Sequence, residues 1–195
     1  LGGLGYYVLG GYASEVNSIR KEADSLVRNS TEETFRRYRT SVVYAADGSV
    51  ISKLNDQGAS YYLKRDEIPQ SVIDAVVCME DQRFYQHRGV DFRALVRAAK
   101  SLLENRKITQ GGSTITMQLA RNVFLTQEKT WQRKVEEIFI AQNLEKKYTK
   151  DQILEFYLNN IYYGNGYYGI GAAGSGYFDS EVGDLDLSQI AFLCA

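Results

Sequence analysis

Two glutamates in this 195-residue chain have surroundings that could make their carboxylates reactive. Glu80 stands four residues after Val76 and seven after Ile73, so it continues an apolar stripe at helical spacing. At the end of a buried helix face, loss of water raises the pKa of a carboxylate and makes it a stronger base toward a hydroxyl. The same position also suits a frayed helix end, with Glu80 directed into water.

Glu137 follows Arg133 by four residues and Lys134 by three, so a helix would place both cations beside the acid. A surface ion pair of this kind contributes only about 0 to 1 kcal/mol to stability. The order of cation before acid is also the less stabilising one in a helix. Two interpretations therefore stay open: a surface ion pair, or a group that handles a charged ligand.

The segment GGSTITMQLARN, residues 111 to 122, brings two glycines and several hydroxyls to a predicted helix start. Free N–H groups and hydroxyls at such a start can bind an anion, although most segments of this kind are only helix caps. From residue 105 to 135 six basic residues face one acid, in a chain of net charge -1. The six are Arg106, Lys107, Arg121, Lys129, Arg133 and Lys134. This excess suits a phosphate or an anionic membrane surface.

Two carboxylates and a cationic anion site together indicate glycosyl transfer with a phosphate leaving group. One carboxylate would take a proton from an attacking hydroxyl, while Arg and Lys stabilise the charge that develops on the departing phosphate. A hydrolase that cuts a plain glycosidic bond needs an acid at its sugar leaving group and has no use for cations there. The basic excess therefore favours synthesis over hydrolysis.

Composition limits the fold that must position these groups. With 44% hydrophobic residues, 24% charged residues and a single proline, the chain predicts one mainly helical domain. A net charge of -1 gives no indication of a nucleic-acid partner. Cys78 and Cys194, with His87 as the only histidine, lack the spacing of a Cys/His metal site.

Local patterns place the individual elements. A β-hairpin is predicted around the Asp-Gly pair of SVVYAADGSVISKL, and helices follow from Pro69 onward. Asp91 can cap a helix whose Phe92 and Val96 belong to an apolar, scaffolding face. The capping box TKDQ opens a later helix. The aromatic residues of IYYGNGYYGIGAAGSGYF could stack on sugars, lie at a membrane interface or simply pack.

The two ends of the chain suggest connections to other segments. Residues 1–13, LGGLGYYVLGGYA, carry no charge but are shorter than the roughly 20 residues that cross a bilayer. They fit either the outer remnant of a transmembrane anchor, with tyrosines at the interface, or an ordinary apolar helix. Residues 14–40 predict a polar helix or linker. The final DLDLSQIAFLCA reads as a helix that has just begun, so a further segment is expected after it.

Four ordered motifs give the chain a specific resemblance. The first, E-D-x-x-F-x-x-H-x-G, is present as Glu80, Asp81, Phe84, His87 and Gly89. The second, G-G-S-T-x-T-Q-Q-x-x-K-N, is present as Gly111, Gly112, Ser113, Thr114, Thr116, Gln118 and Asn122. The third, R-K-x-x-E, is present as Arg133, Lys134 and Glu137. The fourth, K-x-x-I-L-E-x-Y-L-N, occupies residues 150 to 159.

By these motifs residues 41–195 resemble the peptidoglycan glycosyltransferase domain of glycosyltransferase family 51, found in class A penicillin-binding proteins and monofunctional transglycosylases. Two residues depart from the family pattern. Arg121 replaces a Lys and keeps the charge as a planar fork rather than a point charge. Met117 replaces a Gln, which puts in doubt the polar contact that the Gln makes.

The resemblance implies a mainly α fold, with a lysozyme-like lobe and a smaller membrane-facing lobe, on the outer face of the bacterial cytoplasmic membrane. The implied substrates are lipid II and a lipid-linked glycan strand. Glu80 would deprotonate the 4-hydroxyl of the acceptor GlcNAc. That hydroxyl would attack the anomeric carbon of the donor MurNAc, form a β-1,4 link with inversion and release undecaprenyl pyrophosphate. A C-terminal transpeptidase domain is the implied partner in bifunctional members, with the present domain C-terminally truncated.

Site roles follow from the same resemblance. Glu137 would join Glu80 in catalysis by steadying the pyrophosphate, directly or through a divalent cation such as Mg²⁺ or Mn²⁺, and no other cofactor is implied. His87 and Phe84 would brace the turn that carries Glu80. The predicted substrate-binding residues are Asp81, Phe84, His87, Ser113, Thr114, Gln118, Arg121, Asn122, Arg133 and Lys134.

Two rival classes stay open. A lysozyme-like peptidoglycan-cleaving enzyme would share the fold and one Glu, but not the paired cations beside a second Glu. A catalytically silent membrane scaffold would keep the fold without needing Glu80 and Glu137 together.

Overall fold

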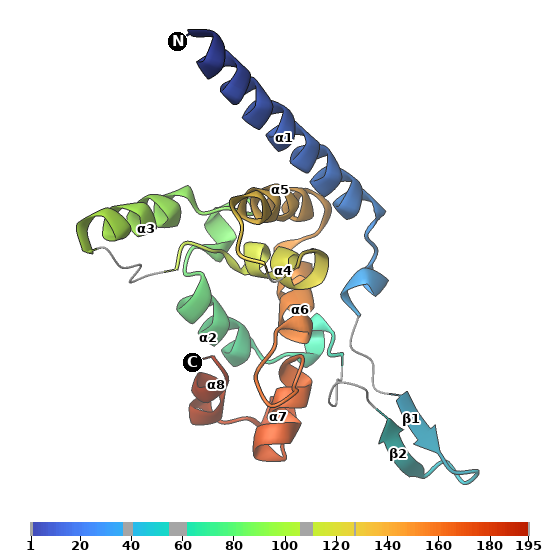
Figure 1. The fold of residues 1–195 in the computed structure, drawn as a ribbon. Coiled ribbons are helices and arrows are strands. Elements are labelled where there is room, and N and C mark those ends of the chain that lie inside the picture. The colour runs from blue at the N-terminus through green and yellow to red at the C-terminus, as the bar shows by residue number, and fades with distance from the viewer. Residues whose placement is uncertain (1, 37–40, 55–61, 106–110, 127, 195) are drawn as a thin grey trace. The chain divides into compact units, whose positions relative to one another are not determined.

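The computed structural model describes residues 2–36, 41–54, 62–105, 111–126 and 128–194 (Figure 1). Within these ranges the chain is mainly helical, as predicted. It divides into two compact units, where composition pointed to one domain. Unit 1 comprises residues 1–30 and 88–148, and unit 2 comprises residues 31–87 and 149–195. Each unit joins two separate stretches of sequence, which is why composition and length give no sign of the division.

In its described residues, unit 1 contains four helices. They are α1 (Gly2–Asn29), α3 (Phe92–Asn105), α4 (Ile115–Phe124) and α5 (Trp131–Lys147). Thr114 caps α4 by accepting a hydrogen bond from the backbone N–H of Met117, and Thr130 caps α5 in the same way. α1 runs without a break through the position where the apolar start of the chain gives way to polar residues. None of the helices in the described ranges is both long and apolar enough to cross a lipid bilayer.

A small apolar core joins α4 and α5. Val90, Met117 and Ala141 are buried there. Gly89 lies beside it with φ +86°, and a Cβ at this position would come within 2.7 Å of the backbone carbonyl of Ala141. Glycine is therefore required at position 89 both by backbone conformation and by space.

The α3 helix differs from its prediction. Asp91 caps it as expected, accepting hydrogen bonds from the N–H groups of Arg93 and Ala94. However, Phe92 and Val96 are 65% and 68% exposed, so the expected scaffolding face is not covered at these two residues. The periodic pattern correctly indicates a helix, but spacing alone does not reveal whether another element packs against a given face.

The part of unit 2 that the structure describes combines a small hairpin with four helices. Strands β1 (Ser41–Tyr44) and β2 (Val50–Leu54) pair antiparallel across a turn. The helices are α2 (Gln70–Glu80), α6 (Lys150–Asn160), α7 (Ile170–Phe178) and α8 (Leu187–Leu193). Short 3-10 helices are η1 (Glu32–Phe35), η2 (Arg65–Glu67), η3 (Phe84–Gln86) and η4 (Val182–Asp184).

Helix α6 anchors several segments of unit 2. Its predicted capping box forms between Thr149 and Gln152. The rings of Phe156 and Phe35 stack with centroids 4.0 Å apart. The Asn159 side chain accepts from the backbone N–H of Leu63 and donates to its carbonyl, both at 2.8 Å. These contacts fix the chain that leads into α2.

Candidate functional site

The first two turns of α5 carry Arg133, Lys134 and Glu137. The Glu137 side chain is only 1% exposed. Lys134 Nζ lies 2.7 Å from its Oε2, and Arg133 Nε lies 3.3 Å from its Oε1. The predicted adjacency of the three residues is confirmed. The interpretation as a surface ion pair is wrong, because the carboxylate is buried.

This trio keeps an excess positive charge, since two cations share one carboxylate. Lys134 Nζ has three N–H donors and gives one to Glu137 and another, at 2.9 Å, to Ser113 Oγ. Its side chain is 37% exposed, so a dissolved anion can reach it. Oε1 of Glu137 accepts no hydrogen bond from the described residues. A buried carboxylate in this state depends on its cations, and it holds them in place in return.

The loop before α4 is held by Thr114 rather than by Ser113. The Thr114 hydroxyl is buried, donates to the carbonyl of Gly89 at 2.7 Å and accepts from the N–H of Met117 at 3.1 Å. Both uses are structural, so Thr114 positions Ser113 at the ammonium group of Lys134. A direct contact between Thr114 and substrate stays a prediction.

The outer face of α4 carries Gln118 with Arg121 and Asn122, which follow it by three and four residues; all three are partly exposed. Met117 points the other way and is 0% exposed in the core. Met117 therefore contributes an apolar side chain to the core at a position where the family pattern has the polar residue Gln. Two basic residues of the predicted excess, Arg106 and Lys107, lie outside the described residues.

In unit 2, Glu80 is the last residue of α2 and is exposed. Val72, Ile73 and Val76 are buried, so the predicted stripe is correct up to that point. The predicted burial of Glu80 itself is wrong, because the helix ends there and the final turn faces solvent. The alternative, a helix end directed into water, describes its position.

Directly after Glu80, a buried hydrogen bond between Asp81 and His87 joins the two ends of a turn. His87 Nε2 lies 2.8 Å from Asp81 Oδ2, and both side chains are buried. The Phe84 ring packs edge-on against His87, and Lys150 Nζ lies 4.2 Å above the Phe84 ring. These contacts suit the bracing role that the resemblance implies for His87 and Phe84. Contacts of Asp81, Phe84 or His87 with substrate stay predictions.

The sequence patterns did not indicate two residues that interact with Glu80, namely Cys194 and Tyr163. Burial raises the pKa of the Cys194 thiol, and the charge of Glu80 adds to the effect. Burial also raises the pKa of Tyr163, with further contributions from Tyr157, Cys194 and Glu80. Both residues are far from Glu80 along the chain, so no spacing pattern could have indicated them.

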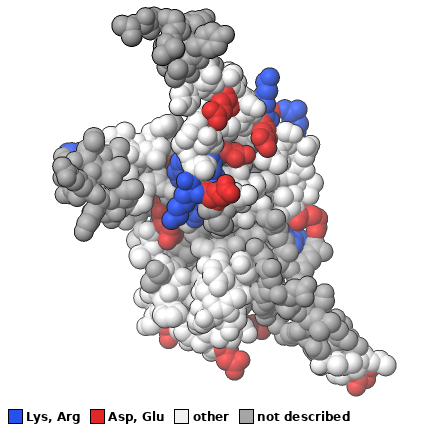
Figure 2. All heavy atoms as spheres, in the orientation of Figure 1, with Lys and Arg blue, Asp and Glu red and all other residues white. Residues whose placement is uncertain are grey.

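Charged groups of both signs lie together on the face that Figure 2 shows. In the view of Figure 2, Lys and Arg side chains are accompanied by Asp and Glu rather than forming one broad basic field. Among the described residues no group of three or more His, Cys, Asp or Glu side chains has the arrangement of a metal site. Glu137 is a poor ligand for a resident divalent cation, because the nearest charged groups to its carboxylate are themselves cations.

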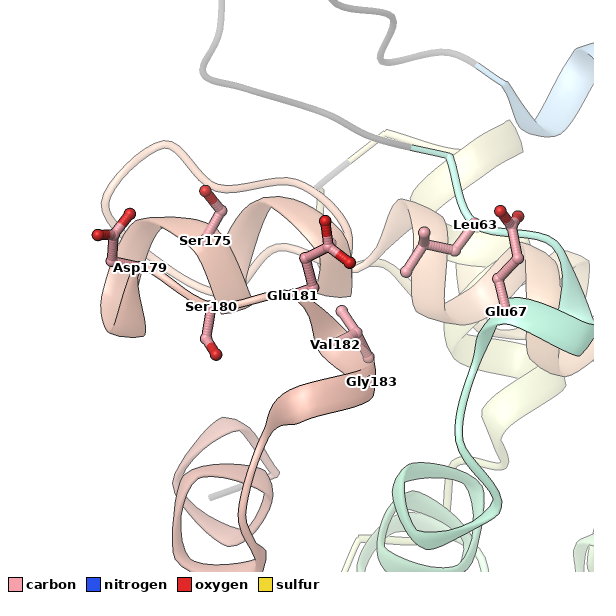
Figure 3. A pocket seen from close by; sticks show the side chains of 9 residues that line it. Leu63, Glu67, Ser175, Asp179, Ser180, Glu181, Val182 and Gly183 are labelled. Atoms are coloured by element: carbon pink, nitrogen blue, oxygen red, sulfur yellow. The ribbon is translucent and has the colours of Figure 1, made fainter.

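Unit 2 also contains a hollow of about 660 Å³ that none of the predicted site residues lines. Its carboxylates come from η2 and from the chain after α7, as Figure 3 shows. They are Glu67, Asp179 and Glu181. An acidic lining repels a phosphate, so the hollow is not a site for the predicted leaving group.

Comparisons with known proteins agree with the motifs. The family described as Transglycosylase matches residues 47–195. Penicillin-binding protein 4 of Bacillus subtilis (strain 168) is 39% identical over 182 residues, which cover 93% of this chain and 29% of that protein. Penicillin-binding protein 1A of Vibrio cholerae is 46% identical over 151 residues, or 77% of this chain and 18% of that protein. Penicillin-binding protein 1A of Escherichia coli (strain K12) is 44% identical with the same coverage. The chain thus spans less than a third of the length of these relatives.

Proposed function

The chain belongs to the transglycosylase family, and from this premise we propose that it is a peptidoglycan glycosyltransferase that polymerises lipid II. The observation that carries the proposal is the buried Glu137 with Arg133 and Lys134 bound to it. A site with a fixed surplus of positive charge is suited to a pyrophosphate, whose negative charge grows as it leaves.

The donor would bind with its pyrophosphate at this trio. Lys134 and Arg133 would stabilise the leaving oxygen, while Glu137 holds both cations in position. Ser113 would orient the ammonium group of Lys134, to which it is hydrogen-bonded. Gln118, Arg121 and Asn122 on α4 would line the donor side. Because the positive groups are already in place, little reorganisation is needed during the reaction.

Glu80 would be the general base. Its exposure allows an acceptor hydroxyl to reach the carboxylate, which a buried group would not permit. The proton of the GlcNAc 4-hydroxyl passes to Glu80, and the oxygen bonds to the anomeric carbon of the donor MurNAc. The bond from that carbon to the pyrophosphate oxygen breaks, and undecaprenyl pyrophosphate leaves. In-line displacement inverts the anomeric centre and gives a β-1,4 link.

We assign no step to a divalent cation, since the residues around Glu137 do not fit a resident one. A cation that accompanies the pyrophosphate would be part of the substrate.

The names and lengths of the relatives are the basis for two further proposals, on the domains of the native protein and on where the reaction takes place. Penicillin-binding proteins cover far more sequence than this chain, so we propose that the native protein also carries a transpeptidase domain. A lipid-linked substrate implies that the catalytic domain works at the outer face of the cytoplasmic membrane.

The test is turnover of labelled lipid II in detergent, with products resolved by length, for the wild-type chain and Glu80→Gln. Long glycan strands from the wild type alone would support the polymerase. If finished glycan is cut while lipid II stays intact, the peptidoglycan-cleaving alternative holds. If neither substrate changes and circular dichroism shows a folded chain, the scaffold alternative holds.

A further inference from the structure

Helices α1 and α5 of unit 1 lie side by side in the same direction. At one end the rings of Tyr12 and Trp131 meet edge to face with centroids 5.8 Å apart. At the other end the hydroxyls of Ser30 and Tyr148 are 3.0 Å apart. Lys147 Nζ also donates to the backbone carbonyls of residues 27 and 28 at 2.9 Å. The seam between the two helices is thus fixed at both ends.

Between these ends the seam opens into a hollow of about 620 Å³, a volume typical of a ligand site. Its lining is polar, apart from Phe139. The residues are Asn17, Arg20, Lys21 and Asp24 from α1, with Phe139, Gln142, Asn143 and Lys146 from α5.

The balance of charge in the hollow is positive. It contains three cations and one carboxylate, and that carboxylate, Asp24, already forms an ion pair with Arg28. Lys146 donates to the neutral side-chain oxygen of Asn143 at 3.2 Å. Arg20 and Lys21 form no ion pair with any of the described residues. Side-chain amides beside unpaired cations are the groups that bind phosphate oxygens.

The aromatic pair indicates where such a phosphate would come from. Tyr12 and Trp131 are 55% and 43% exposed, although both are large and apolar. Exposed Tyr and Trp side chains are enriched at the membrane interface, and residues 1–11, which precede Tyr12, carry no charge. At 1.5 Å per residue, Arg20 and Lys21 lie about 12 to 14 Å beyond Tyr12 along α1, and Lys146 lies about 22 Å beyond Trp131 along α5. The long side chains of Arg20 and Lys21 can extend back along α1 and so shorten their distance to lipid headgroups, whereas Lys146 is the basic residue farthest from the aromatic pair.

We propose that the α1–α5 hollow binds the phosphate of an anionic phospholipid headgroup. The proposal rests on the membrane setting of the proposed function but not on its chemistry, because none of the lining residues belongs to the catalytic or donor-binding groups. Bound lipid would hold α1 and α5 together and fix the unit against the membrane surface.

The test uses flotation of the whole chain with vesicles of phosphatidylcholine alone or mixed with phosphatidylglycerol. The wild type should bind the mixed vesicles preferentially. Arg20→Gln/Lys21→Gln/Lys146→Gln should lose about 25-fold in affinity, from about fivefold for each of Arg20 and Lys21, the two basic residues nearer the surface. The matched control, Arg93→Gln/Arg97→Gln/Lys100→Gln on α3 of the same unit, removes the same charge and should lose far less.

Three results would overturn the proposal. Equal losses in both triple variants would mean that general charge attraction, not the hollow, binds the vesicles. Unchanged binding by the hollow variant would exclude the hollow directly. Inorganic phosphate that raises the Tm of the wild type but not of the hollow variant, without vesicle binding, would identify a site for free anions instead.

Polymerisation of lipid II in neutral detergent separates this proposal from the proposed function. The hollow variant should keep wild-type turnover there. Loss of vesicle binding with full turnover supports the lipid site, whereas an inactive wild type that still binds vesicles would contradict only the proposed function.

Discussion

Glu137 and Glu80 are the same residue type in opposite settings. Glu137 lies in the second turn of α5, is 1% exposed and is bound to two cations. Glu80 ends its helix and is exposed. A buried, paired carboxylate can fix charges but cannot receive a substrate proton easily, while an exposed one can accept a proton but organises little around it. On this difference we propose the electrostatic role for Glu137 and the base role for Glu80.

The largest expected effect comes from removing the exposed carboxylate. Glu80→Gln should lower kcat for lipid II polymerisation by about 10²- to 10⁴-fold, the usual contribution of a general base. Stability should change by less than about 0.5 kcal/mol, because the side chain is at the surface. Single-turnover kinetics and urea unfolding measure the two quantities. A large loss of stability would show that Glu80 has a structural role, which would contradict the contrast drawn between Glu80 and Glu137.

The next largest loss of turnover is expected from replacing Lys134, the partly exposed cation beside Glu137. Lys134→Gln should lower turnover by about 10²- to 10³-fold, as expected when a fixed group that stabilises the transition state is removed. Lys129→Gln, an exposed lysine just before α5, is the matched control and should stay near wild type. Equal losses in the two variants would point to general attraction of the anionic substrate rather than to a defined contact.

The buried carboxylate should affect stability most. Glu137→Gln leaves Arg133 and Lys134 without their counter-charge and should lower the free energy of unfolding by about 3 kcal/mol. Urea unfolding followed by circular dichroism measures the change. A variant as stable as the wild type would mean that the cations do not depend on Glu137, contrary to the role given to it here.

A substitution at Met117 tests whether the buried position 117 is more stable with the Gln of the family pattern or with the apolar side chain found here. Met117→Gln restores the family residue, yet it places an amide in a core position that is 0% exposed. The free energy of unfolding should fall by about 1 to 3 kcal/mol, the cost of a buried polar group without a partner. Thermal and urea unfolding give the value. A stabilised variant with faster turnover would show that the amide finds a partner at the site.

The smallest effect is expected at Glu136, the half-buried neighbour of Glu137. Burial, and then the charge of Glu22, raise the pKa of Glu136 above its ordinary value of 4.5. The folded state therefore binds this proton more tightly than the unfolded state, and the contribution of Glu136 to stability falls as pH rises through and above 4.5. Glu136→Gln should show a slightly flatter loss of stability over that range. An identical pH profile for both proteins would contradict the raised pKa.

Local chemistry in the sequence predicted local structure well. The caps at Asp91 and Thr149 and the adjacency of Arg133, Lys134 and Glu137 follow from spacing within one helix. Burial could not be predicted in the same way. Whether Glu137 is covered depends on segments distant in sequence, and whether Glu80 is covered depends on the residue at which α2 ends.

Contacts between segments distant in the sequence could not be predicted from it either. Ser113 and Lys134 are 21 positions apart, and no periodic pattern links a loop residue to a residue on the next helix. The same applies to Tyr163 and Cys194 beside Glu80. The α1–α5 hollow likewise arises from two helices at opposite ends of unit 1's sequence, each of which shows only scattered basic residues by itself.

The central claim is that the two glutamates divide anion binding from proton transfer. Calorimetric titration with inorganic pyrophosphate tests it directly for the wild type, Glu80→Gln and Lys134→Gln. We expect Glu80→Gln to bind pyrophosphate with the wild-type Kd although it does not polymerise lipid II. We expect Lys134→Gln to bind at least about tenfold more weakly. Binding that is weakened as much by Glu80→Gln as by Lys134→Gln, or that is unchanged in Lys134→Gln, would contradict the division.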